Sequence, residues 1–283
     1  MREGFEYNPD TDPQQRMGEI RDAFESQNNY EGAIKQFDDA MTKWSREGQQ
    51  DAALELAQKV ELYRSQVEES QPELLNRFDT KLAEAHFYAG GRENKNLEDA
   101  EERYQRVATT KLAELHGDEY ALTEAERKQY SEVFHALDRL ADVAFADGRY
   151  LEAGDRYAEA IDKRAEFTDD PNEQGPLACA IYGAAASAFM EGNVEDAQRL
   201  TEEALQQLEN READEDLLHT NIQALSVAID QYQELNADHQ KLVMAKLEDA
   251  VLERGGSGGG VKRFNFESMY NEAVAEANIN EDV

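Results

Sequence analysis

Apolar residues recur along the chain at intervals of three or four, with charged residues between them. This spacing places the apolar side chains on one face of an α-helix. We see no segment with the pattern of a strand, so the sequence predicts an all-α fold. Boundaries of this kind carry an uncertainty of two to four residues. The predicted helices span residues 13–27, 30–46, 50–69, 72–89, 96–116, 123–147, 150–166, 175–191, 194–210, 213–235 and 238–253.

A short pattern recurs where these helices meet. At four places a Gly or Asn is followed five residues later by Ala, at Ala33, Ala53, Ala153 and Ala197. The Gly or Asn suits a helix end that needs a left-handed residue, and the Ala allows two helix backbones to approach closely. The pattern continues four residues later with Phe37, Ala57, Tyr157 and Thr201, and three later with Ala40, Val60, Ala160 and Ala204. We therefore expect Ala153, Ala160, Ala197 and Ala204 at helix–helix contacts.

The pattern resembles the tetratricopeptide repeat, a helix-turn-helix unit with small residues at these places. The resemblance is strong over 134–167 and 178–210, where the large and small positions of the unit are filled by Leu137, Leu140, Ala141, Ile181, Ala184 and Ala185. It is looser over 14–60, and the spacing from Gly148 to Gly192 exceeds the usual repeat of about 34 residues. Stacking the predicted helices as antiparallel pairs gives a right-handed α-solenoid over residues 13–254, as the resemblance also implies. Residues 1–12 are predicted to form an irregular arm before it.

Members of this family usually bind ligands on the concave surface formed by the first helix of each pair. Carried over by position, the resemblance implies a partner-binding groove of His135, Asp138, Asp142, Phe145, Tyr182, Ala186, Phe189 and Met190. An exposed cluster of aromatic and Met side chains would suit an anchor pocket. The alternative is that Phe145, Phe189 and Met190 are core side chains. His135 either bonds to a ligand or is satisfied locally.

The composition is strongly acidic, with 62 Asp and Glu against 29 Lys and Arg and a net charge of −33. This charge argues against partners with a phosphate backbone and against anionic membranes. It resembles the charge of cytoplasmic proteins of halophilic archaea, although a generic acidic scaffold is the alternative. The chain has one cysteine and no apolar run long enough to span a membrane, so we expect a cytoplasmic protein.

The segment 255–260, Gly-Gly-Ser-Gly-Gly-Gly, is free of charge and resembles an engineered flexible linker. Residues 261–283 then read as an amphipathic ligand peptide, either fused from a partner or a natural tail. Asn265 is a plausible helix N-cap. The predicted anchors are Lys262, Arg263, Phe264, Phe266, Met269 and Tyr270. The short linker lets this tail reach the surface near Tyr182, whereas contact with the early helices would require a swapped dimer.

Sites for chemistry are not evident in the sequence. The five His residues lack the spacing of a zinc motif, and no phosphate-binding loop is present, so we expect neither a metal nor a cofactor. We therefore expect a protein–protein interaction module, an adaptor or chaperone-like protein rather than an enzyme, that binds a short amphipathic segment of a partner. The alternatives are an all-helical hydrolase with a carboxylate pair, and a regulatory sensor occluded by its own tail.

Overall fold

The computed structural model describes residues 13–25, 29–46, 49–89, 95–114, 124–165, 174–208, 217–254, 260–261 and 264–277. Within these ranges all regular structure is helical. The predicted arm at 1–12 lies outside them. The helices are α1 (Pro13–Glu25), α2 (Tyr30–Arg46), α3 (Gln50–Glu61), α4 (Arg64–Ser70), the short 3₁₀-helix η1 (Pro72–Leu74), α5 (Leu75–Ala89), α6 (Lys95–Glu114), α7 (Glu124–Ala146), α8 (Tyr150–Ala165), α9 (Gln174–Met190), α10 (Val194–Leu208), α11 (Leu217–Glu234), α12 (Ala237–Arg254) and α13 (Phe266–Glu276).

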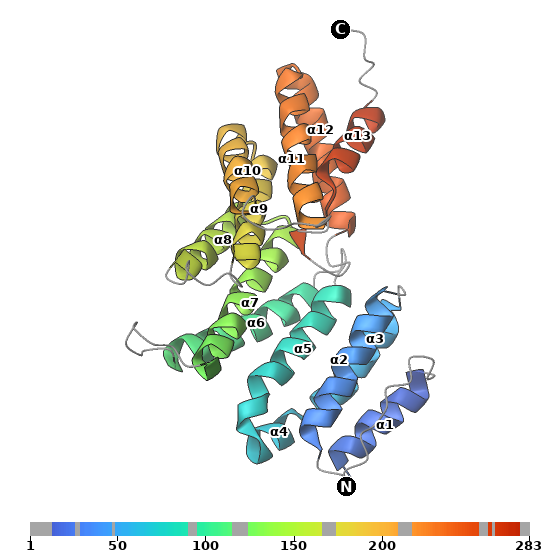
Figure 1. Ribbon diagram of the computed structural model, residues 1–283. Coiled ribbons are helices and arrows are strands. Elements are labelled where there is room, and N and C mark those ends of the chain that lie inside the picture. The colour runs from blue at the N-terminus through green and yellow to red at the C-terminus, as the bar shows by residue number, and fades with distance from the viewer. Residues whose placement is uncertain are drawn as a thin grey trace.

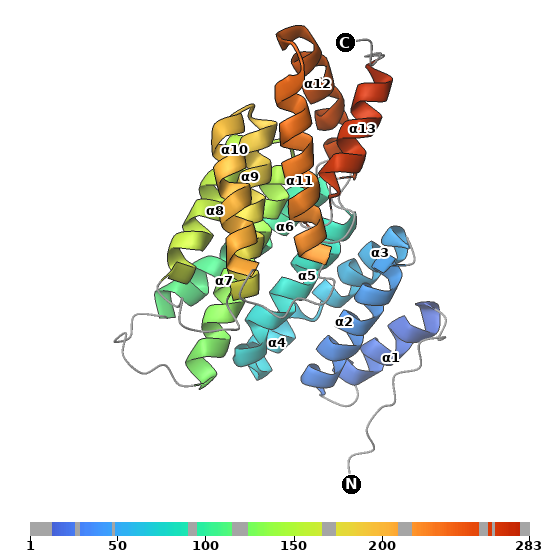
Figure 2. The same cartoon turned by 45° about the horizontal axis from the view of Figure 1, so that its top comes forward.

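The helices stack in chain order, so that α1 and α13 lie at opposite ends of the molecule (Figure 1). Sequential neighbours from α5 to α11 pack against one another, and α1, α2 and α3 form a similar stack at the other end. The same succession is visible from a second direction (Figure 2). The predicted all-α solenoid is therefore confirmed.

The two best-matching turns have the same geometry. Gly148 and Gly192 adopt positive φ angles of 76° and 78°. In each turn this glycine donates its N–H to the carbonyl three residues before it, and the next residue donates to the carbonyl five before it, at 2.8 to 3.0 Å. This is the Schellman ending of a helix. The prediction of a left-handed residue at these two turns is confirmed.

Small residues lie where the repeat predicts them. Ala153, Ala160, Ala197 and Ala204 are fully buried. A Cβ at Gly183 of α9 would lie 2.3 Å from the ring of Tyr157 on α8, so these two helices approach as closely as a glycine permits. Side-chain size therefore sets the spacing of the helix pairs.

One predicted helix is wrong. The segment 50–69 is two helices, because the chain turns at Leu62 and Tyr63 between α3 and α4. The turn brings the Tyr63 ring onto Phe24 of α1, with ring centroids 4.6 Å apart and the rings parallel within 3°, and the hydroxyl donates to Glu25 at 2.6 Å. The helix is therefore interrupted at the point where Tyr63 packs on α1. The neighbouring helix also starts later than predicted, because residues 72–74 form η1.

Buried apolar side chains form three clusters in order along the chain. The N-terminal cluster lies among α1 to α5 and includes Phe24 and Phe78. The middle cluster joins α5, α6 and α7 and includes Ala160 of α8. The C-terminal cluster extends from α7 to α13, and its members include Phe266 and other residues that follow the Gly-rich stretch.

Candidate segment-binding site

The described residues 260–261 and 264–277, which we call the tail segment, lie against the C-terminal helices. The segment begins with Gly260 and Val261 and continues as helix α13. Both views show α13 beside α11 and α12 (Figures 1 and 2), and each of these two helices packs more closely against α13 than against the other. The tail segment therefore completes the packing at this end of the solenoid.

Asp142 of α7 holds the start of the tail segment. Its Oδ1 accepts hydrogen bonds from the Val261 backbone N–H at 3.0 Å and from the Tyr157 hydroxyl at 2.6 Å. Its Oδ2 accepts from the Arg139 guanidinium at 2.9 Å. Burial, reinforced by the Asp142 carboxylate, raises the pKa of Tyr157 well above its usual value, so the hydroxyl remains a donor. A buried carboxylate with three donors is a satisfied acceptor for the tail backbone.

Gly260 fits against the same carboxylate. Its φ is +69°, and a Cβ at this position would lie 2.0 Å from Asp142 Oδ2 and 2.2 Å from Oδ1. No side chain could occupy this space without displacing the carboxylate. Gly260 is therefore part of the docked segment and not of the linker, to which the sequence pattern assigned it. Residues 255–259 lie outside the described residues.

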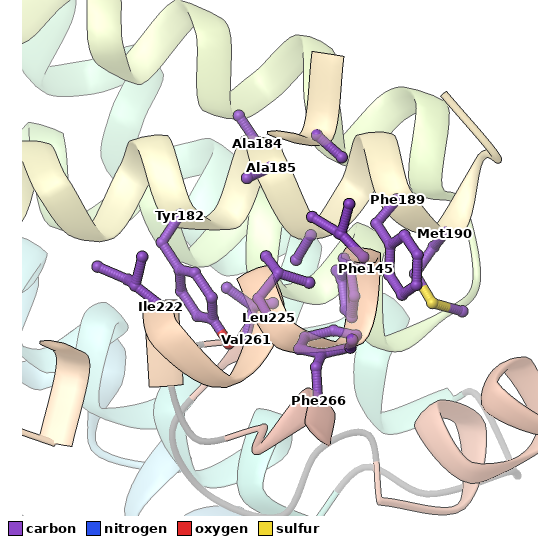
Figure 3. Close-up of a cluster of buried hydrophobic side chains, with 14 of the residues drawn as sticks. Phe145, Tyr182, Ala184, Ala185, Phe189, Met190, Ile222, Leu225, Val261 and Phe266 are labelled. Carbon is purple, nitrogen blue, oxygen red and sulfur yellow. The ribbon is translucent and has the colours of Figure 1, made fainter. Parts of the chain in front are cut away.

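Phenylalanine rings of the tail pack on rings of the solenoid. Phe145 of α7 lies 5.8 Å from Phe264 and 6.5 Å from Phe266, centroid to centroid. Phe189 of α9 lies 6.3 Å from Phe266 and 5.4 Å from Tyr232 of α11. Figure 3 shows Phe266 directed toward Phe145 and Phe189. Three of these four contacts are edge-to-face, a geometry that stabilises each pair by about 0.5–1.5 kcal/mol beyond burial.

Tyr182 of α9 provides a second polar contact to the tail backbone. Its hydroxyl donates to the Phe264 carbonyl oxygen at 2.9 Å, while its ring is buried. Burial raises the pKa of this hydroxyl well above its usual value, which keeps the donor protonated. Tyr182 and Asp142 therefore fix the tail backbone at Phe264 and Val261, independently of the side chains there.

Helix α13 buries one face. Asn265 caps it, since its side-chain oxygen accepts from the Ser268 N–H at 2.9 Å. The buried side chains are Phe266, Met269, Tyr270 and Ala273, at helical spacing. Burial raises the pKa of Tyr270 to about 12. At the far end Glu276 forms an ion pair with Lys246 of α12 at 3.4 Å.

The structure brings only part of the predicted groove to the tail segment. Asp142, Phe145, Tyr182 and Phe189 contact it, and Ala186 and Met190 are buried in the same cluster. Phe145, Phe189 and Met190 are therefore core side chains in this structure, and the tail supplies part of the cover. The predicted anchors Phe264, Phe266, Met269 and Tyr270 lie in the docked segment, whereas Lys262 and Arg263 lie outside the described residues.

His135 and Asp138 face other helices. His135 Nε2 lies 3.1 Å from Glu84 of α5, and Asp138 binds Arg164 of α8 through both oxygens at 2.7 and 2.6 Å. Burial raises the pKa of Asp138, and Arg164 opposes this effect. Burial also works to raise the pKa of Glu84, but His135 and Lys81 hold it down to about 2. These residues join helices and do not reach the tail.

Sequence reasoning missed four residues of the site: Arg139, Tyr157, Gly260 and Val261. Tyr157 was assigned only a packing position in the repeat, and its hydroxyl role depends on Asp142 of another helix. Cys179, the one cysteine, is half-buried on α9. Among the described residues no group of three His, Cys, Asp or Glu side chains could hold a metal ion.

Comparison with known proteins gives a fold and no family. No protein-family model matches the chain, and no curated protein matches it. The crystal structure of BtubC (BKLC) from P. vanneervenii is similar, with a TM-score of 0.55 over 95% of this chain and 90% of that one, at 14% identity. At this identity the likeness concerns the fold alone. In the described part of the chain, no helix is long and apolar enough to cross a membrane.

Proposed function

We propose that this protein is a helical-repeat interaction module whose C-terminal face binds a short segment: a glycine turn followed by an amphipathic helix. The observation that carries the proposal is the seating of the tail segment. Phe266 lies between Phe145 and Phe189, Asp142 accepts a hydrogen bond from the tail backbone, and Tyr182 donates one to it. Aromatic anchors in a buried patch, joined by backbone contacts, are typical of peptide recognition.

The two carboxylates of α7, Asp138 and Asp142, favour binding over hydrolysis. A catalytic pair of acids would face a site that a substrate can enter. Here Asp138 is bound to Arg164, and Asp142 accepts from Arg139, Tyr157 and Val261. Their lone pairs are directed to protein donors, which supports a role in holding helices and the tail segment.

A second candidate function is a module regulated by its own tail. In this chain the occupant follows α12 through the Gly-rich residues 255–259, and it covers Phe145 and Phe189. A partner segment with similar anchors would have to displace it. The short connection gives the tail a high effective concentration, so only a tightly binding partner would compete.

The test is exchange of the segment in the full chain. A protease site placed within 255–259 is cut after folding, in the presence of an excess of a fluorescent peptide covering residues 258–277. We expect the peptide to replace the cleaved segment and to increase in anisotropy. The matched control peptide carries Phe266→Ala and Tyr270→Ala, and it should bind at least about tenfold more weakly, because the two aromatic anchors are lost.

Two results would overturn the proposal. Unfolding of the solenoid upon cleavage would make the tail segment an integral helix rather than a bound segment. Equal anisotropy for the parent and doubly substituted peptides would mean that Phe266 and Tyr270 are not binding anchors. Circular dichroism before and after cleavage reports the first, and the titration reports the second.

A further inference from the structure

Resting on the proposed function, we infer that the docking face is selective for segments with glycine at the position of Gly260, and that Asp142 is the residue that reads it. The ligand class is a peptide in which glycine precedes an aliphatic residue. Two phenylalanines then flank a helix-capping residue, and Met and Tyr follow one turn later. In the tail segment these positions are Gly260, Val261, Phe264, Asn265, Phe266, Met269 and Tyr270.

The glycine requirement has two causes at Gly260. The first is its φ of +69°, which L-residues with a side chain rarely adopt. The second is the Asp142 carboxylate, which lies 2.0 to 2.2 Å from the place of a Cβ. The two causes can occur separately: Gly192 has a φ of +78°, but no atom lies within 4 Å of its Cβ position. Among the described glycines, only Gly260 combines the backbone conformation with a close polar wall.

Asp142 cannot easily move away from this wall position. Its two oxygens accept from Tyr157 on α8 and Arg139 on α7, and the carboxylate is buried. The same Oδ1 accepts the Val261 N–H, the amide that directly follows the glycine. The carboxylate therefore requires a backbone N–H at the position of Val261 and excludes a side chain at the position of Gly260, one residue earlier. Together these two requirements fix where the motif starts along a partner segment.

The spacing after the glycine is also fixed by the helix cap. The Phe264 N–H donates to the Val261 carbonyl at 3.0 Å, which closes a turn between the glycine and the helix. Asn265 then starts α13, with Phe264 just before the cap and Phe266 just after it. Tyr182 holds the Phe264 carbonyl at 2.9 Å. Polar contacts at Val261 and Phe264 thus set the distance between the glycine and the aromatic pair.

The experiment uses the cleaved full chain and three synthetic peptides covering residues 258–277, which carry Gly, L-Ala or D-Ala at position 260. They compete with the fluorescent parent peptide. We expect L-Ala to weaken binding at least about tenfold. D-Ala favours positive φ and places its Cβ on the other side of Cα, so it should bind at least about fivefold more tightly than L-Ala. In an Asp142→Ala protein the loss caused by L-Ala should shrink to a few-fold.

The outcomes separate this inference from the proposed function. If the parent peptide does not bind, the proposed function fails. If the parent peptide binds and L-Ala competes as well as Gly, the glycine selectivity is wrong while the binding function stands. If L-Ala weakens peptide binding equally in the parent and Asp142→Ala proteins, the selectivity arises from φ alone, and Asp142 does not cause it. If the Asp142→Ala protein does not fold, the parent protein provides the test. Equal competition by the L-Ala and D-Ala peptides would then overturn the role of Asp142.

Discussion

The two ends of the solenoid close their cores differently. In the N-terminal cluster, Phe24 is covered by Tyr63 and Phe78, which belong to the same run of consecutive helices. In the C-terminal cluster, Phe145 is covered by Phe264 and Phe266, which lie more than a hundred residues further along the chain. The first core is complete once its neighbouring helices have stacked. The second needs a segment that follows the Gly-rich stretch.

This difference shows how a segment from far along the chain can cover apolar side chains that the stacked helices leave open on one side. Stacked repeats bury each helix mainly against its neighbours along the chain. Here Phe145 of α7 and Phe189 of α9 are fully buried, and Phe266 of α13 packs against both rings. The same side chains would become exposed anchors if the tail segment left.

Removing one phenylalanine at each end should give the largest effect. Phe24→Ala and Phe266→Ala both delete a fully buried ring, at a cost of about 3–5 kcal/mol. Phe24→Ala should lower the free energy of unfolding of the helices around it. Phe266→Ala should instead release the tail segment, so that hydrogen exchange of α13 amides accelerates while α8 and α9 keep their protection. Equal acceleration in α9 and α13 would contradict separate closure of the C-terminal core.

Overpacking a repeat position should give a smaller effect. Ala197 is fully buried on α10, so Ala197→Leu should reduce the free energy of unfolding by about 1–3 kcal/mol, measured by urea denaturation. Glu202→Leu, at an exposed position of the same helix, is the matched control and should change stability by less than about 0.5 kcal/mol. An Ala197→Leu protein as stable as the parent would mean that the repeat register is wrong.

The stability of the contact between α5 and α7, which lies between the two end clusters, should depend on pH. Glu84 of α5 bonds to Lys81 and to His135 of α7, and its pKa is lowered from 4.5 to about 2. Its stabilising effect is therefore complete above about pH 4.5 and is lost as the pH falls toward 2. Glu84→Gln should cost about 1–3 kcal/mol at about pH 7 and progressively less at about pH 3. Urea denaturation of both proteins at the two pH values measures this, and a pH-independent difference would contradict it.

Removing a helix cap at each end should give the smallest effect. Asn29 accepts from the Gly32 N–H at 3.2 Å at the start of α2, as Asn265 does from the Ser268 N–H at the start of α13. Each Asn→Ala change should cost about 1 kcal/mol, and Asn→Asp should preserve the cap. Asn29→Ala should lower the melting temperature, whereas Asn265→Ala should mainly weaken the tail segment, seen as faster amide exchange in α13. A lower melting temperature from Asn265→Ala alone would reverse the assignment.

The repeat geometry was predictable because it is local. Gly148 and Gly192 take positive φ where the sequence pattern requires a helix end, and Ala153 and Ala197 are buried where it requires a small residue. The helix over 50–69 was not predictable in the same way, because its break at Tyr63 depends on stacking with Phe24 from another helix.

The sequence by itself determined that the chain is helical, where the best repeats turn, and that the tail carries an amphipathic helix capped by Asn265. These features depend on spacings of about one to five residues, which the backbone translates directly into geometry. Only the tertiary structure decided that Phe145 and Phe189 are buried and that Gly260 belongs to the docked segment. Both depend on contacts between residues far apart in the chain, such as Asp142 with Val261, 119 residues later. Burial is a property of what packs against a side chain, and no local pattern carries that information.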